Sequence, residues 1–222
     1  MHRNAAAPPP TRARLAAALG GYLPPPGARI GLLGGSFNPA HAGHRQISLE
    51  ALKRLGLDEV WWLVSPQNPL KPVAGMVPLE SRLARARALA CHPRIRVTGI
   101  EDLLACHYTA DTLSTLTRSF PRVRFVWLMG ADNLMQLTKW KDWPEIFHIV
   151  AVAVFDRPSY SLRAIAARAA RRFARYRLDE DRARGLAGHV PPAWVFVHSR
   201  LSTLSATQIR ARGRQAEPPG PR

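Results

Sequence analysis

Cysteine is scarce in this chain, with only Cys91 and Cys106 among its 222 residues. The two form no Cys-x-x-Cys pair and provide no disulfide framework, so nothing in the sequence requires an oxidising compartment. No apolar run approaches the ~20 residues of a membrane-spanning helix, and the N-terminus has no secretory apolar region. These absences argue against a membrane protein and a disulfide-rich scaffold, and we expect a cytoplasmic protein.

Acidic residues are also few. The chain has 15 Asp and Glu against 32 Lys and Arg, which gives a formal net charge of +17. This surplus favours anionic partners, either nucleic acid or phosphorylated metabolites, and the charge alone does not choose between them. Because much of it lies in the tails and in one arginine-rich segment, away from the motifs described below, we interpret it mainly as a solvated surface.

The ends of the chain differ in composition from the middle. Residues 1–28 hold no Asp or Glu and carry two proline triplets, which predicts a largely disordered extension with one or two helical turns near Arg14 to Leu19. A transit peptide is an alternative that the proline triplets argue against. Residues 29–213 form the predicted α/β domain, for which the 46% hydrophobic content suffices, and residues 214–222 form a predicted disordered tail.

The chain is organised around residues 34–44, which read Gly-Gly-Ser-Phe-Asn-Pro-Ala-His-Ala-Gly-His. An apolar run at 30–33 predicts a buried strand before this stretch, and the pattern after it predicts a helix. A strand, a glycine turn and a helix N-terminus direct backbone N–H groups at one spot, which suits a phosphate. His41 and His44 lie at the helix entrance, three residues apart, and Gly43 lets a ligand approach the backbone closely.

Two other interpretations of this stretch stay open. The simpler one is a glycine turn with two surface histidines, but it does not explain why Gly-Gly, Asn-Pro and His-x-Gly-His occur together. A metal site is weaker still, because no Cys, Asp or Glu follows before Glu50. We therefore predict a phosphate site and no protein metal site.

Apolar segments alternate with helical patterns along the rest of the chain, at 60–64, 95–97, 123–129, 150–155 and 194–197. This alternation predicts an α/β fold: a Rossmann-like, doubly wound parallel sheet with helices on both faces. Residues that follow the strands then gather at one edge of the sheet. Lys71 is there either a phosphate contact or a solvated loop lysine, and Arg157 is either a phosphate contact or part of a surface ion pair. Glu101 with Asp102 reads better as a solvated turn than as an acid pair.

Several helix starts carry polar or aromatic candidates. Thr109 is a natural N-cap. Asp132 follows a glycine turn and is placed either to bind a ribose or base amine or to cap the next helix. Trp140 is either a stacking platform for a flat ring or a core residue, whereas Trp143 is expected in the core. Residues 161–184 read as a solvated helical region with eight arginines, and RNA binding there is a minor alternative.

The segment 204–210, Leu-Ser-Ala-Thr-Gln-Ile-Arg, carries a second set of anion donors. Ser205 and Gln208 have the spacing of a capping box, so a helix begins here. Ser205, Thr207 and Arg210 would offer donors to an anion at that helix start. A capped terminal helix without a ligand is the alternative.

These two segments resemble the nucleotidyltransferase superfamily that carries a His-x-Gly-His motif after its first strand and an Ile-Ser-Ser-Thr-x-x-Arg signature near its end. Ala206 replaces one serine of that signature. The longer first motif looks like that of the nicotinate-nucleotide adenylyltransferases, as do Tyr-Thr-x-Asp-Thr at 108–112 and Arg-Pro-Ser-Tyr at 157–160, where Ser159 replaces glycine. The resemblance covers roughly 29–212.

The resemblance implies adenylyl transfer from ATP to nicotinate mononucleotide, which gives nicotinate adenine dinucleotide and pyrophosphate in NAD biosynthesis. It implies Mg²⁺ bound through the ATP phosphates. The catalytic residues would be His41, His44 and Arg210. ATP would be bound by Gly34, Gly35, Ser36, Phe37, Gly43, Asp132, Ser205 and Thr207. The acceptor would be bound by Asn38, Lys71, Thr109, Trp140, Lys141 and Arg157, with Trp140 against the nicotinate ring and the Lys141 N–H at its carboxylate.

Two rival interpretations remain. The same chemistry on nicotinamide mononucleotide, phosphopantetheine or another phosphorylated acceptor is the nearest, because recognition of a ring carboxylate by a backbone N–H leaves no sequence signature. A basic nucleic-acid-binding protein is the rival from another class, and it leaves both phosphate signatures unexplained. The sequence does not decide whether the protein is a homo-oligomer.

Overall fold

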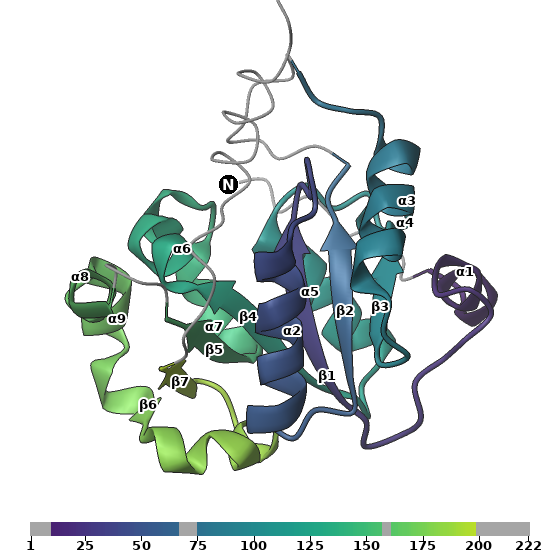
Figure 1. The fold of residues 1–222 in the computed structure, drawn as a ribbon. Coiled ribbons are helices and arrows are strands. Elements are labelled where there is room, and N and C mark those ends of the chain that lie inside the picture. The colour runs from purple at the N-terminus through teal and green to yellow at the C-terminus, as the bar shows by residue number, and fades with distance from the viewer. Residues whose placement is uncertain (1–9, 67–74, 157–160, 199–222) are drawn as a thin grey trace, which may run out of the picture.

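The computed structural model describes residues 10–66, 75–156 and 161–198. Its centre is a single sheet of seven parallel strands in the order β3-β2-β1-β4-β5-β7-β6 (Figure 1). The strands are β1 (Arg29–Gly35), β2 (Glu59–Val64), β3 (Ile95–Thr98), β4 (Arg124–Gly130), β5 (Ala151–Phe155), β6 (Arg177–Leu178) and β7 (Trp194–Val197). This architecture confirms the predicted α/β, Rossmann-like parallel sheet.

Helices cover both faces of the sheet, and Figure 1 shows α2 in front of it with α5 and α7 behind. The α-helices are α1 (Arg12–Ala18), α2 (Ala42–Arg54), α3 (Leu79–Ala90), α4 (Ile100–Leu103), α5 (Thr109–Ser119), α6 (Ala131–Gln136), α7 (Trp143–Ile149), α8 (Ser161–Ile165) and α9 (Arg168–Arg172). Three 3₁₀ segments are η1 (Leu137–Lys139), η2 (Ala174–Tyr176) and η3 (Glu180–Gly188).

Neighbouring strand residues point into two separate hydrophobic cores. On β2, Trp61 packs under α4 and α5 with Leu32 of β1, whereas Trp62 packs under α2 and α3 with Leu33. All four side chains are at most 4% exposed. Because successive strand residues face opposite sides, a strand covered on both faces must be apolar throughout, which is why these strands read as unbroken apolar runs.

The structure places α1 where one or two helical turns were expected near Arg14 to Leu19. The rest of 1–28 was expected to be largely disordered, and the docking of α1 on the domain was not predicted. Helix α1 inserts Leu15 and Leu19, 3% and 2% exposed, into the core that faces α4 and α5. The Thr98 hydroxyl and the Arg96 guanidinium then donate hydrogen bonds to the carbonyls of Ala18 and Leu19. Two leucines one turn apart thus give this short helix an apolar face, which anchors it despite the prolines around it.

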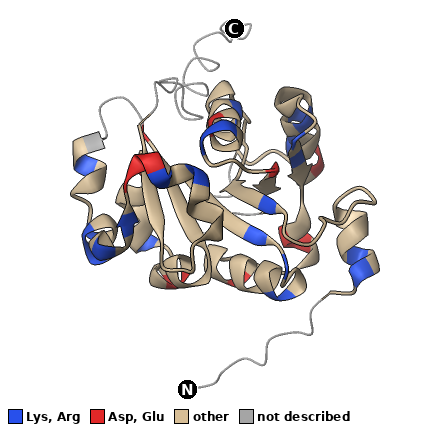
Figure 2. Cartoon of the chain, turned by 90° about the horizontal axis from the view of Figure 1, so that it is seen from below, with Lys and Arg blue, Asp and Glu red and all other residues tan. Residues whose placement is uncertain are grey.

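The arginine-rich region 161–184 is not one helix either. It contains the short helices α8 and α9, and then β6, whose two residues pair with β7 at the edge of the sheet. Lys and Arg are spread over many elements of the fold in Figure 2, with Asp and Glu much rarer. Within the described ranges, no helix is long and apolar enough to span a membrane.

Candidate active site

The glycine turn after β1 lies where the sheet changes direction. Strand β1 has β2 on one side and β4 on the other, and the chain reaches β4 only after β3. In open parallel sheets, ligands bind in the crevice that forms at the carboxyl ends of the strands at such a switch point. The turn at 35–41 and the β4–α6 junction at 130–132 both end at this crevice. The topology therefore brings Asp132 to the same edge as the two histidines.

The histidines pair at the start of α2. His41 is the N-cap residue in extended conformation, and its ring centroid lies 3.8 Å from that of His44. The His41 N–H donates to Nδ1 of His44 at 3.2 Å. An Nδ1 that accepts a hydrogen bond leaves Nε2 as the protonated nitrogen of a neutral imidazole. His44 is thus oriented as a hydrogen-bond donor through Nε2, beside the N-terminal amides of the helix.

Phe37 packs against His44 of the histidine pair. The centroid of its ring lies 4.5 Å from that of the His44 ring and 5.1 Å from that of Trp62, on which it stacks. The side chain is 2% exposed, and its backbone has a left-handed φ of 46°. Trp62 in turn donates to the hydroxyl of Ser48, which donates to the His44 carbonyl. Since the Phe37 ring is buried, only its backbone can serve the ATP site predicted there.

The first glycine of the motif is required by packing. A Cβ on Gly34 would lie 2.4 Å from Cη2 of Trp127, whereas a Cβ on Gly35 would lie 3.5 Å from its nearest neighbour, in Phe37. Trp127 is buried and meets the ring of Trp140 edge to face at 6.4 Å. An aromatic chain thus connects the glycine turn to Trp140.

The remaining residues of the turn are held by neighbours. Ser36 is 5% exposed, and Gly43 is also buried. Asn38 donates from Nδ2 to the Gly75 carbonyl at 3.0 Å. The predicted acceptor contact of Asn38 is therefore accompanied by a role in holding residue 75 beside the motif.

Thr109 and the Trp140–Lys141 pair, far apart in sequence, are brought together. Lys141 places its ammonium 4.4 Å from the ring centroid of Tyr108, the residue before Thr109. Trp140 and Trp143 are both half-buried and both pack against the core, so Trp143, expected in the core, lies at its margin, and Trp140 keeps an exposed part. The predicted acceptor residues of α5 and of the η1–α7 connection therefore form one group.

Two predicted helix caps are wrong by one or two positions. Tyr108, in extended conformation, is the N-cap of α5, and Thr109 is its first helical residue. Gly130 is the N-cap of α6, which places Asp132 in the first turn with its side chain partly exposed. A carboxylate in the first turn interacts favourably with the positive end of the helix dipole, although it does not cap the helix.

Glu101 is buried rather than in the solvated turn expected. It is 8% exposed and accepts a hydrogen bond from the Thr112 hydroxyl at 3.0 Å. Burial raises the pKa of Glu101 to about 7, and hydrogen bonds from the hydroxyls of Thr112 and Ser65 partly oppose this. Ser65 follows β2 and Thr112 belongs to α5, so Glu101 joins the end of a strand to the helix that begins at Thr109.

Arg82 is the second residue that sequence reasoning missed. It is 2% exposed on α3 and contacts the glycine turn through the Ser36 carbonyl. The sequence held one signal for it, since Arg82 falls at helical spacing beside the buried Leu83 and Ala86.

Five predicted site residues lie outside the described residues. They are Lys71, Arg157, Ser205, Thr207 and Arg210. In the described part of the chain, no group of three or more His, Cys, Asp or Glu side chains is arranged to hold a metal ion.

Comparison with known proteins identifies the family. The cytidylyltransferase-like family model matches residues 32–212. A probable nicotinate-nucleotide adenylyltransferase of Methylorubrum extorquens is 54% identical over 184 residues, which cover 83% of this chain and 100% of the relative. One of the same name from Cereibacter sphaeroides is 54% identical over 185 residues, 83% of this chain and 97% of the relative.

Solved structures share the fold at low sequence identity. The nicotinic acid mononucleotide adenylyltransferase of Plasmodium falciparum, complexed with NaAD, superposes with a TM-score of 0.62 at 15% identity and 83% coverage of both chains. The family match and the similarity to the curated relatives indicate the same kind of enzyme as the paired histidines at the switch point of the sheet. The chain is a nucleotidyltransferase that belongs to the cytidylyltransferase-like family, on its nicotinate-nucleotide adenylyltransferase branch.

Proposed function

We propose that the protein transfers the adenylyl group of ATP to nicotinate mononucleotide, which yields nicotinate adenine dinucleotide and pyrophosphate. The observation that carries the proposal is the pair of imidazoles at the N-terminus of a helix on the switch point of the sheet, with ring centroids 3.8 Å apart and planes tilted by 36°. The names of the curated relatives, 54% identical to this chain, support the same reaction.

In the proposed reaction, an oxygen of the acceptor phosphate attacks the α-phosphorus of ATP. The bond from that phosphorus to the oxygen bridging the β-phosphate breaks, and pyrophosphate leaves with the electron pair. The acceptor phosphate is an anion at neutral pH, so the protein needs to supply position and charge stabilisation rather than a nucleophile. In this proposal, Nε2–H of His44 and the N-terminal amides of α2 would donate to the reacting phosphates.

The other predicted residues take roles around this centre. The backbone at Gly34, Gly35 and Phe37 would receive the nucleotide, and Asp132 at the end of β4 would hydrogen-bond its ribose or base. The exposed part of Trp140 would stack on the pyridine ring beside Thr109. Ser205, Thr207 and Arg210 would bind the β- and γ-phosphates, and Lys71, Arg157 and Asn38 the acceptor.

Mg²⁺ belongs to this proposal as an ion carried by ATP. The described residues gather no carboxylate cage, so the ion would take its oxygen ligands from the phosphates and water, as Mg²⁺ commonly does at such sites. Its chemistry would be to neutralise charge on the leaving pyrophosphate. We also keep a cytoplasmic location in the proposal, because the reaction draws on the ATP pool there.

The test is pyrophosphate release from ATP and Mg²⁺ with nicotinate mononucleotide or nicotinamide mononucleotide in parallel assays. We expect a strong preference for the acid. A preference for the amide would leave the site and the chemistry in place but contradict the acceptor. No release with either compound would contradict the proposed function, and salt-sensitive RNA binding would then be the next measurement.

A further inference from the structure

Arg82 is a buried cation at the edge of the site. Its side chain enters the protein from α3 and is 2% exposed. A buried guanidinium normally has a carboxylate partner, because removing a charge from water is costly. Among the described residues, no ion pair of Arg82 with an acidic side chain is present. Burial without a counter-charge lowers the pKa of this guanidinium from its usual value.

Backbone carbonyls take the place of the missing carboxylate. Nη1 donates to the carbonyls of Ser36 and Ser65, each at 2.7 Å, and Nη2 donates to that of Pro66 at 2.8 Å. Nε donates to the Val77 carbonyl at 2.8 Å. These four acceptors belong to three segments: the glycine turn after β1, the end of β2 and the residues before α3. The planar fork of one arginine thus joins three separate stretches of chain.

The contact with Ser36 fixes one peptide of the glycine turn. In a trans peptide the N–H points opposite to the C=O, so a Ser36 carbonyl that faces Arg82 turns the N–H of Phe37 away from α3. Within the described residues, this N–H donates no hydrogen bond. Phe37 also holds a left-handed φ of 46°, which a side chain larger than glycine rarely adopts. Such a conformation persists only where its surroundings hold it.

We infer that Arg82 is a positioning residue of the phosphate site: by binding the Ser36 carbonyl against the end of β2, it holds the Ser36–Phe37 peptide with its N–H presented to a phosphate. The inference rests on the proposed function for the identity of the substrate, but not for the existence of the anion site. It also assigns a purpose to the burial of a cation that has no acidic partner among the described residues.

A purely electrostatic role is the alternative, and it predicts a different response to lysine. Lysine keeps the positive charge, but its donors all sit on one atom and cannot reach four carbonyls from three segments. If Arg82 acts only as a charge, Arg82→Lys keeps activity. If it acts as a clamp, Arg82→Lys loses activity nearly as far as Arg82→Met does.

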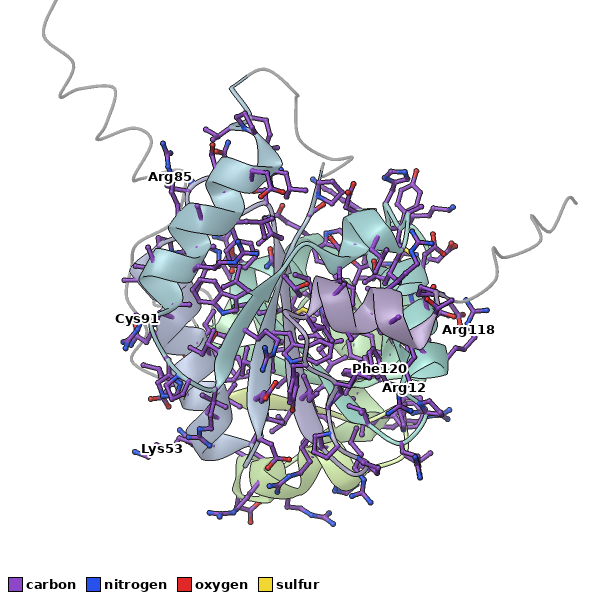
Figure 3. The ribbon with its side chains drawn as sticks, turned by 90° about the vertical axis from the view of Figure 1, so that its right-hand side faces the viewer. Arg12, Lys53, Arg85, Cys91, Arg118 and Phe120 are labelled. Atoms are coloured by element: carbon purple, nitrogen blue, oxygen red, sulfur yellow. The ribbon has the colours of Figure 1, made fainter. Side chains whose placement is uncertain are left out.

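The helix itself offers a matched control. Arg85 lies on α3 one turn from Arg82, is exposed, and stands at the outer surface of the helix in Figure 3. Arg85→Met and Arg85→Lys make the same chemical changes without touching the turn. These variants are expected to behave as the unmodified protein.

The experiment measures kcat, KM, ATP binding by calorimetry and the thermal transition for each variant. We expect Arg82→Met and Arg82→Lys to lower kcat by roughly a hundredfold, the cost of misplacing reacting groups by about 1 Å, with a smaller change in the KM of the acceptor. We also expect millimolar methylguanidinium to restore part of the activity of Arg82→Ala. Ethylammonium, which carries the charge without the planar fork, should restore none.

The outcomes separate this inference from the proposed function. Unchanged kcat and ATP binding in Arg82→Met, or full activity in Arg82→Lys, would overturn the positioning role. The positioning role would also be overturned if Arg82→Ala kept its thermal transition but lost activity that methylguanidinium does not restore. If the unmodified protein binds ATP but turns over neither mononucleotide, the proposed acceptor is wrong. The ATP affinity of the variants then still tests the positioning role of Arg82. Any variant without a thermal transition is refolded with methylguanidinium present before it is assayed.

Discussion

The hydroxyl of Thr112 donates a 3.0 Å hydrogen bond to the carboxyl group of Glu101, eleven positions earlier in the chain. The same hydroxyl lies 3.2 Å from the Tyr108 carbonyl at the N-cap of α5. Glu101 also bonds the hydroxyl of Ser65, whose carbonyl accepts from Arg82. One buried polar chain therefore runs from the glycine turn to the helix that begins at Thr109.

This chain predicts a specific dependence of stability on pH. Burial raises the pKa of Glu101 to about 7, above the 4.5 of an exposed glutamate. The folded protein thus keeps the proton where the unfolded chain has lost it, so the stabilisation is complete below pH 4.5 and is lost as the pH rises to about 7. Glu101→Gln cannot ionise. As the pH rises across this range, the difference in the free energy of unfolding between Glu101→Gln and the unmodified protein should shift by about 3 kcal/mol in favour of the variant.

Urea unfolding at several pH values from 4 to 8 measures the difference. Asp102→Asn is the control, because it removes an exposed carboxyl from the same helix without touching the buried group. A constant difference between Glu101→Gln and the unmodified protein at all pH values would show that the pKa of Glu101 is the same in the folded and unfolded protein, which would contradict the prediction.

Gly34 and Gly35 are expected to differ in their tolerance of alanine. A Cβ on Gly34 would meet Trp127 at 2.4 Å, and the buried indole ring has little room to move. Gly34→Ala should therefore destabilise the fold by about 1–3 kcal/mol, as overpacking does. Gly35→Ala, with its nearest atom at 3.5 Å, is the matched control. Equal midpoints of urea unfolding for the two variants would contradict the packing argument.

His44→Ala tests the catalytic assignment. Loss of the Nε2 donor should lower kcat by roughly 10²–10³-fold, the usual effect of removing one donor to a charged transition state. The thermal transition should change little, because the ring is only half-buried. His148→Ala, an exposed histidine on α7, is the control in the same turnover assay. Normal turnover by His44→Ala would place the reaction elsewhere.

Trp140→Ala should separate acceptor binding from ATP binding. An aromatic platform for a flat ring contributes about 1–3 kcal/mol, so the Kd of the mononucleotide should rise roughly tenfold or more while that of ATP changes little. Trp143→Ala is the control, because Trp143 is also half-buried but packs against Phe173. Calorimetric titration with each substrate measures both constants. Equal losses for ATP and the mononucleotide would remove the stacking role.

Leu19→Ala tests whether α1 belongs to the folded unit. Leu19 is 2% exposed, so its truncation should cost about 2–5 kcal/mol of unfolding free energy. Leu162→Ala makes the same change at a position that is 85% exposed and should cost almost nothing. A wild-type urea midpoint for Leu19→Ala would mean that α1 adds little to the fold.

Local patterns in the sequence predicted the parts of the site that are local in the chain. His41 and His44 lie within one helical turn of each other, and Gly34 and Gly35 precede them by only a few residues. Spacing alone therefore sets their arrangement. The parallel sheet followed from the alternation of apolar runs and helical patterns. Cap positions were less accurate, because Thr109 is an effective capping residue by type, yet the chain enters α5 one residue earlier, at Tyr108.

Glu101 and Arg82 were missed because their partners are distant. A charged side chain is exposed unless specific groups compensate it, and no spacing in the sequence connects Arg82 with Ser36 or Ser65. The docking of α1 was not predicted for a similar reason. The prolines around it are a local signal of disorder, whereas Arg96 and Thr98, which donate hydrogen bonds to its last carbonyls, lie some eighty positions later in the chain.

The position of α1 also protects the sheet itself. Among the strands of the described residues, β3 is the last on its side of the sheet, so its outer row of peptide groups faces no other described strand. Such a row is a template on which a second molecule can add its own strand. Helix α1, bonded to the side chains of Arg96 and Thr98, lies beside this edge in Figure 1. Its docking thus places a helix where an added strand would otherwise pair, and we expect this to limit edge-to-edge association between molecules.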